Sequence, residues 1–221
     1  MTIAQAPTNP NLRWREFEKL ELPPLLLCAL EEFVAHGYDG TTVRAIAKQA
    51  SLTVPSIYYH YENKQGLLVA LLDVSVDDVL ERASAAIQES GPGPEERLGA
   101  FVEAVVLYVA YRRDLALLDN EIRSLEPTNR VAYVKKRDNL EGWLMEIIRQ
   151  GIETAAFEVA YPVEARRAIL AMCRGVSAWY DASGSLAAEE VAIRYVDLAL
   201  QVVGSKRPSR LPQQATRQPG S

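Results

Sequence analysis

The sequence predicts an all-α protein, built from a small N-terminal helical module and a larger C-terminal helical domain. Three observations support this fold class. Apolar residues recur at intervals of three and four along most of the chain, as they do on the buried face of a helix. Prolines and glycines separate these periodic segments. No segment of useful length alternates apolar and polar residues with the period of a strand.

The first periodic segment begins after Pro23 and Pro24, which suit only the first turn of a helix. Apolar residues then follow at helical spacing, and Gly37 stands where a left-handed C-terminal cap would end the helix. Thr42 offers a hydroxyl to cap the next helix, whose apolar stripe leaves Arg44 facing outward. We therefore expect two helices joined by a short turn.

A tight turn at residues 51–53 leads to a second short helix opened by Pro55. In that helix only Ile57 and Tyr61 are spaced to face inward. The side chains left outside are Ser56, Tyr58, Tyr59 and His60. An exposed aromatic face is costly unless a partner covers it, and phosphates accept hydrogen bonds from tyrosine and imidazole groups. The pattern predicts a helix-turn-helix that binds DNA.

Asn63 is placed to cap a long helix whose first turn carries Lys64, so an ammonium lies beside free backbone N–H groups where a phosphate could bind. The alternative is that residues 42–61 form an ordinary helical hairpin with partly buried tyrosines. Charge does not decide between the two, because the chain is acidic, with a formal net charge of -5. It does argue against a non-specific polyanion binder, which would be more basic.

With 221 residues, the chain has room for one DNA-binding module and one helical domain with its own core. It contains no apolar run of membrane-spanning length and no signal-peptide pattern, so we expect a cytoplasmic protein without a membrane partner. Cys28 and Cys173 are expected to be buried, reduced thiols. The predicted divisions are an N-terminal extension (1–21), the helix-turn-helix domain (22–68), the helical domain (69–204) and a disordered basic tail (205–221).

Periodicity beyond the module predicts six further helices. Their expected bounds are 64–88, 94–113, 115–125, 128–154, 163–182 and 187–203. Gly91 to Pro94, Pro127 and Pro162 mark the junctions. Residues 11–20, with Trp14, Phe17 and Leu20, are expected to add a short helix before the first one.

The last helix is apolar on nearly all sides, which indicates a partner beyond its own core. One stripe carries Val191, Tyr195, Leu198 and Val202, and the opposite one carries Ile193, Val196, Leu200 and Val203. Because one stripe suffices for the core, the other predicts contact with a second copy of the chain. The preceding helix, with Ile169, has similar spacing, so the two helices could form a four-helix bundle across a two-fold axis. The sequence leaves open which stripe faces the partner.

Residues 37–64 resemble the TetR family of transcriptional repressors. The family pattern is matched by Gly37, Tyr38, Thr41, Thr42, Val43, Ile46, Ala47, Ala50, Tyr58, His60 and Lys64. The resemblance implies a repressor that binds a double-stranded DNA operator as a homodimer. It places Thr42, Tyr58, His60 and Lys64 on the DNA backbone and Thr53, Pro55, Ser56 and Tyr59 near base edges. Ser51 departs from the family pattern, which usually has glycine there, and Val54 and Pro55 depart from it as well.

Residues 137–203 resemble the C-terminal domain of repressors that sense acyl-CoA thioesters, although Ala155 stands where those relatives commonly have glycine. This implies a small effector held in the helical domain, with a hydrophobic drug-like compound as the competing ligand class. Aromatic and apolar residues expected around the effector are Tyr108, Tyr111, Leu115, Trp143, Ile147, Met172, Val176 and Trp179. Arg112, Arg113, Arg123 and Arg174 are candidate cations for phosphates, and ordinary core packing or solvated helix faces are the alternative for all of these.

An enzyme is a hypothesis from another class, and the sequence argues against it. The only histidines, His36 and His60, both fall in the DNA-binding part. The sequence has no nucleophile elbow, no phosphate-binding glycine loop and no metal-ligand spacing. We therefore expect no catalytic residue, no metal and no cofactor. A helical scaffold that does not bind DNA is the third alternative.

Overall fold

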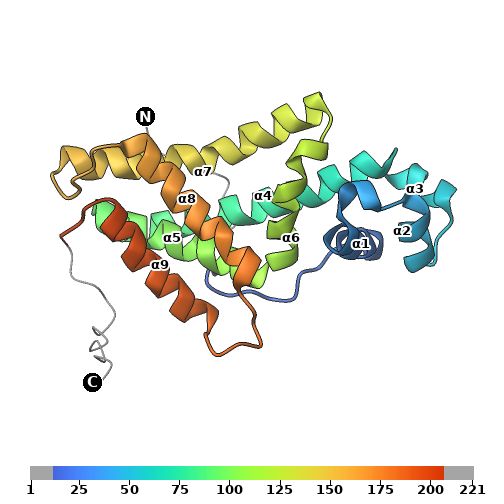
Figure 1. Ribbon diagram of the computed structural model, residues 1–221, viewed down its shortest axis with the longest axis horizontal. Coiled ribbons are helices and arrows are strands. Elements are labelled where there is room, and N and C mark those ends of the chain that lie inside the picture. The colour runs from blue at the N-terminus through green and yellow to red at the C-terminus, as the bar shows by residue number, and fades with distance from the viewer. Residues whose placement is uncertain (1–11, 207–221) are drawn as a thin grey trace, which may run out of the picture.

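A computed structural model describes residues 12–206 (Figure 1). These residues contain helices and no strand, so the predicted fold class is confirmed. The elements are α1 (Pro24–Gly40), α2 (Val43–Gln49), α3 (Val54–His60), α4 (Lys64–Glu89), α5 (Pro94–Tyr111), α6 (Arg113–Leu117), the 3₁₀ helix η1 (Leu118–Ser124), α7 (Pro127–Glu153), α8 (Pro162–Trp179) and α9 (Ala188–Val202). Residues 1–11, and residues 207–221 of the predicted basic tail, lie outside the described residues.

Helices α1 to α3 form the module at one end of the molecule, and α4 runs from it into the helical domain (Figure 1). Helices α2, α3 and α4 each begin at a residue whose side chain caps the helix. The Thr42 hydroxyl accepts a hydrogen bond from the Ala45 N–H at 3.1 Å, and Thr53 caps α3 in the same way. Asn63 caps α4. Gly37 interrupts α1 with a φ of 70°, as its expected capping position requires.

The core of the helical domain is built around α5. This helix packs against α4, α7, α8 and α9, and most of its residues from Leu98 to Ala110 are buried. Helix α9 packs directly on α5 at Gly99, where an added Cβ atom would be in van der Waals contact with a methyl carbon of Val196, at 3.4 Å. The long helix α4 therefore joins the module to a bundle whose central helix contacts nearly every other element.

The prediction of a single α-helix over 115–125 is wrong, because the structure has a short α-helix followed by a 3₁₀ helix there. Arg112 leaves the helical region, with φ −116° and ψ 36°, so α5 ends at Tyr111 and a five-residue α6 follows. The chain then tightens into η1. An α-helix and a 3₁₀ helix place apolar residues at nearly the same spacing over a single turn, so the pattern does not separate them. Helix α8 also ends early, at Trp179, because Tyr180 is extended.

The helix expected over 11–20 is absent. Residues 12–22 instead form an extended N-terminal strap with one turn near Trp14. The guanidinium of Arg82 in α4 donates hydrogen bonds to the carbonyls of Trp14 at 3.0 Å and Glu16 at 2.9 Å, and lies over the Phe17 ring. Those carbonyls are acceptors that a helix would use internally. Tertiary contacts have therefore overridden the local pattern.

Both cysteines are free thiols, as expected, although Cys28 is half-buried where full burial was expected. Burial raises the pKa of Cys173 to about 12, so this thiol stays protonated. Within residues 12–206 no group of three or more metal-ligating side chains is placed to hold an ion. No helix in that range is both long and apolar enough to cross a membrane.

Candidate DNA interface and ligand cavity

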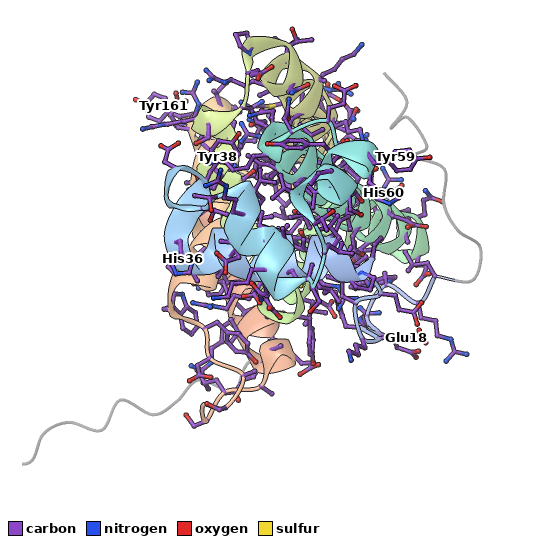
Figure 2. The ribbon with its side chains drawn as sticks, turned by 90° about the vertical axis from the view of Figure 1, so that its right-hand side faces the viewer. Glu18, His36, Tyr38, Tyr59, His60 and Tyr161 are labelled. Atoms are coloured by element: carbon purple, nitrogen blue, oxygen red, sulfur yellow. The ribbon has the colours of Figure 1, made fainter. Side chains whose placement is uncertain are left out.

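Helix α3 presents its aromatic side chains to solvent. Ile57 is fully buried against the module core, whereas Tyr59 is 86% exposed and Tyr58 about half exposed. Tyr59 and His60 project from the module at the rim of the view in Figure 2, with their rings 5.1 Å apart. The remaining expected DNA contacts are also exposed, except for half-buried Ser56 and Lys64: they are Thr42, Arg44, Thr53 and Pro55. The module thus leaves polar and aromatic side chains of α2 and α3 open to a partner.

Lys64 has a structural role that the sequence did not reveal. Its Nζ donates hydrogen bonds to the carbonyl oxygens of Tyr38 at 2.6 Å and Thr41 at 2.8 Å. It also lies 4.0 Å from the centre of the Tyr38 ring. Two of its three N–H groups are therefore used inside the protein, and at most the third can reach a phosphate. The lysine joins the start of α4 to the end of α1.

The helical domain holds a cavity of about 430 Å³, open to solvent on one side, between α4, α5, α6, η1, α7 and α8. Its apolar wall includes Val76, Val79, Val105, Val109, Leu140 and Leu170. At one side the hydroxyl oxygens of Ser75 and Tyr108 lie 2.7 Å apart, and burial raises the pKa of Tyr108 so that its hydroxyl stays protonated. The cavity has the volume and lining of a small-molecule site.

A polar group of residues lies at another side of the cavity. It consists of Asp119 and Asn120 from η1, Tyr133, Arg137 and Glu141 from α7, and Arg174 from α8. The Tyr133 hydroxyl donates to Asp119 at 2.7 Å, and burial together with that carboxylate raises the tyrosine pKa. Asn120 and Arg174 are exposed, so this group lies at the rim where the cavity meets solvent.

Of the residues expected around an effector, Tyr108 lines the cavity, and so does Arg174 among the candidate cations. Trp143, Ile147, Leu115 and Val176 are buried in the core but do not line it. On α7 the cavity-facing stripe is Tyr133, Arg137, Leu140 and Glu141, roughly a quarter turn from Trp143 and Ile147. Aromatic content alone did not identify this stripe; its mixture of polar and apolar residues at helical spacing was the available signal.

The other expected effector contacts lie outside the cavity lining. Arg112 pairs with Asp78 at 3.2 Å, and the Tyr111 hydroxyl donates to Glu189 at 2.6 Å. Met172 is half-buried, and Trp179 is largely exposed and stacked against Tyr195. Arg113 donates to the Ser177 carbonyl, and Arg123 makes no ion pair within residues 12–206. Trp179 therefore belongs to the outer surface of α8.

The helix η1 connects the cavity to the DNA-binding module. Asp119 and Asn120 line the cavity from its start, and the Ser124 carbonyl at its end accepts a hydrogen bond from Gln65 Nε2 at 3.1 Å. The same Gln65 amide donates to the Tyr38 hydroxyl at 3.0 Å. Helix η1 also packs directly against α1. One short element thus contacts both the cavity and the base of the helix-turn-helix.

Helices α8 and α9 share an outer face that combines apolar and small residues. Leu198 is 45% exposed, and Val202, Trp179 and half-buried Tyr195 lie near it on these helices. Small exposed residues continue along α8, namely Ala168, Ala171, Gly175 and Ala178, of which Gly175 and Ala178 also line the cavity. In contrast, Ile169 and Val191 of the expected dimer set are buried in the core of the chain itself. The buried stripe of α9 is Val191, Val196, Leu200 and Val203.

A capped helix-turn-helix with an exposed reading helix, joined through η1 to a domain with an internal cavity, defines a ligand-responsive DNA-binding regulator of transcription. Residues 25–71 match the family described as "Bacterial regulatory proteins, tetR family". Residues 91–203 match "Tetracyclin repressor-like, C-terminal domain". The chain belongs to the TetR family of bacterial transcriptional regulators.

Individual relatives agree with this assignment. The transcriptional repressor KstR2 of Mycobacterium tuberculosis is 27% identical over 179 residues, covering 80% of this chain and 89% of the relative. A TetR-family regulator from Rhodococcus RHA1 superposes with a TM-score of 0.78 at 30% identity, covering 83% of this chain and 97% of that one. The structure of AibR with isovaleryl coenzyme A and operator DNA shares the fold, with a TM-score of 0.72 at 22% identity, covering 82% and 97%.

Proposed function

We propose that this protein is a repressor that binds a palindromic operator as a homodimer and releases it when an effector, best fitted by an acyl-CoA thioester, occupies the cavity. The observation that carries the proposal is the position of η1. A ligand that moves Asp119 or Asn120 acts on the same short helix that holds Gln65 and packs against α1. Occupancy of the cavity and the placement of the reading helix are therefore mechanically joined.

Binding to DNA rests on the exposed face of α3 and the first turn of α2. The N-terminal part of α3, with Thr53, Pro55 and Ser56, is proposed to approach base edges together with Tyr59. Thr42, Arg44, Tyr58 and His60 are proposed to contact phosphates, and so is the remaining N–H of Lys64. A single seven-residue reading helix covers a short half-site. Two copies are needed to recognise a specific operator.

The outer face of α8 and α9 is the proposed dimer interface. It is the exposed part of the expected set, with Leu198, Val202 and Tyr195, and the small residues of α8 let a second copy approach closely. The buried part of that set, Ile169 and Val191, supports the face from within the chain. A two-fold axis through this face produces a four-helix bundle and sets the distance between the two reading helices.

The cavity volume limits what part of an effector can enter. A volume of about 430 Å³ lies near the lower end of the range for small-molecule sites, about 300–1,000 Å³. This accommodates a short acyl or ring system but not a whole coenzyme A, whose nucleotide must stay outside near the rim. The crystal structure of AibR in complex with isovaleryl coenzyme A and operator DNA supports this class of effector. The valine- and leucine-rich wall favours a hydrophobic drug-like compound as the second candidate.

The proposal is tested by selecting operator fragments from a random-sequence library with the full chain and measuring binding by fluorescence anisotropy. We expect an inverted repeat, bound at physiological salt far more tightly than unrelated DNA of the same length. A panel of acyl-CoA thioesters and neutral hydrophobic compounds is then titrated into the complex. Release by a thioester supports the proposed effector, and release only by neutral compounds supports the second candidate. Equal affinity for selected and unrelated DNA refutes the repressor function itself.

A further inference from the structure

The rim of the cavity holds one carboxylate between two arginines. Asp119 Oδ2 lies 3.7 Å from a guanidinium nitrogen of Arg137 and 3.8 Å from one of Arg174. Its other oxygen, Oδ1, accepts the hydrogen bond from the Tyr133 hydroxyl at 2.7 Å. Three helices contribute to this arrangement, η1, α7 and α8, and all four side chains line the cavity.

This carboxylate accepts no hydrogen bond from either arginine. Distances of 3.7 and 3.8 Å are too long for hydrogen bonds, and neither guanidinium donates one to any residue among 12–206. The Nε of Arg137 is buried without an acceptor in that range. Elsewhere in the domain Arg82 reaches Asp78 at 2.6 Å, whereas Arg97 and Arg166 also have a buried Nε without an acceptor in that range. Buried donors without acceptors are costly, which points to a site built for additional oxygen atoms.

The local charge also favours an anion. The nearby Glu141 carboxylate is engaged at 3.0 Å by Arg166, which does not line the cavity. Among residues 12–206, Asp119 is then the one carboxylate that pairs with Arg137 and Arg174, and these three groups together carry a net positive charge. An incoming cation is repelled there, whereas a planar oxyanion can accept hydrogen bonds from both guanidinium groups.

We infer that the cavity binds an amphiphilic acid, whose anionic oxygen group takes the place of Asp119 between Arg137 and Arg174 while its apolar body lies along the valine wall. Asp119 is the built-in occupant of this anion site in the ligand-free protein. The anionic group is either the carboxylate of a free acid or a phosphate of a coenzyme A thioester. This inference rests on the proposed function, because it assigns the chemistry of the same effector site.

Displacement of Asp119 also links the anion site to η1. This residue is the second residue of η1, and the Ser124 carbonyl at the other end of that helix is held by Gln65. While Asp119 lies between the arginines, η1 is fixed at both ends, one toward α7 and α8 and the other toward the module. An anion that replaces Asp119 frees the first of these attachments.

The test compares three probes that share an apolar body: a short-chain fatty acid, its neutral amide and its coenzyme A thioester, each titrated calorimetrically into the full-length protein. We expect the amide to bind about tenfold or more weakly than the better of the two anions. Arg137→Gln and Arg174→Gln should each remove most of that preference and leave amide binding unchanged. If only the free acid is affected, a carboxylate occupies the site; if only the thioester is affected, a phosphate does.

Two further variants separate this role from a general effect on folding. Asp119→Asn keeps an acceptor for Tyr133 but removes the competing charge, so it should strengthen binding of the preferred anion several-fold. Arg166→Gln is the matched control, because it neutralises a neighbouring arginine that does not line the cavity. Circular dichroism verifies that each variant is folded.

The inference is overturned if amide and anions bind equally, if Asp119→Asn weakens the anion, or if the wild-type protein binds none of the three probes at any chain length. Release of the selected operator by an unrelated neutral compound, with no anion preference, rejects the anion site while leaving the proposed repressor intact. Failure to recognise any operator is a separate result that refutes the proposed function.

Discussion

Lys64 and Tyr38 form a double contact across the module, in which the ammonium donates to the Tyr38 carbonyl at 2.6 Å and lies 4.0 Å from the centre of its ring. Figure 2 shows Tyr38 at the other side of the module from Tyr59 and His60. The lysine holds the end of α1 against the start of α4 and leaves one N–H for the proposed phosphate contact. One side chain thus serves both the stability of the module and its expected contact with DNA.

The first prediction concerns this lysine. Lys64→Met retains the length of the side chain but removes two charge-assisted hydrogen bonds, so we expect a loss of about 1.5–3 kcal/mol in the free energy of unfolding. The salt dependence of operator binding should become shallower by roughly one to two units per dimer. Lys48→Met, at an exposed lysine of α2, is the control for stability. Identical urea midpoints for the two variants contradict the structural role.

The second prediction concerns two departures from the family pattern. Ser51 has a φ of 54° and Ala155 a φ of 56°, so both non-glycine residues have the positive φ that favours glycine. Ser51→Gly and Ala155→Gly should each stabilise the protein by about 0.5–1 kcal/mol, because relief of strain exceeds the entropy cost of glycine. The effects should add, since the sites are independent.

The control for these glycine variants is Ala132→Gly, at an exposed position inside α7, which should destabilise by about 1 kcal/mol. Thermal unfolding by calorimetry measures all four proteins. A lower midpoint for Ser51→Gly or Ala155→Gly than for the wild type shows that the positive φ stores no strain.

The third prediction concerns the dimer. Leu198→Glu places a charge on the exposed face of α9, so the dimer should dissociate at higher protein concentration than the wild type in sedimentation equilibrium. Val131→Glu makes the same change at a 68% exposed residue of α7 and should leave the dimer intact. Val196→Glu instead buries an unpaired charge in the core and should unfold the chain. An unchanged dimer for Leu198→Glu places the interface elsewhere.

The fourth prediction concerns the N-terminal strap. Arg82→Met removes the hydrogen bonds to the carbonyls of Trp14 and Glu16, which should lower the free energy of unfolding by about 2–4 kcal/mol and expose residues 12–22 to chymotrypsin. Arg15→Gln breaks an exposed pair with Glu103 and should cost less than about 1 kcal/mol. Equal cleavage rates for the two variants show that Arg82 does not fasten the strap.

The fifth prediction concerns base recognition. Tyr59→Ala should change the order of preference among operator variants without changing stability, because this side chain is almost fully exposed and stands on the proposed reading helix. Tyr161→Ala is the matched control: Tyr161 is similarly exposed but lies in the α7–α8 connection, which is at the other end of the molecule from α1–α3 (Figure 1). If Tyr59→Ala weakens all sites uniformly, its contact is with phosphate.

Local chemistry determined the module. Pro23, Thr42, Thr53 and Asn63 mark where helices begin, because proline geometry and hydroxyl or amide caps act within a few residues. For the same reason the break at Gly37 was predictable, and so was the outward orientation of Tyr58 and Tyr59. These features depend on neighbours in the chain, which a sequence contains in full.

The tertiary structure decided what depends on distant partners. Hydrogen bonds from Arg82 hold as a strap the segment that was expected to be a helix. Lys64 makes a structural contact and is also a candidate phosphate ligand. On α7, Tyr133 and Arg137 line the cavity and Trp143 does not. It also decided which face of α9 remains outside. Helical periodicity shows that a face is apolar but not which neighbour it meets, because the rotation of one helix against another is set by packing between residues far apart in the chain.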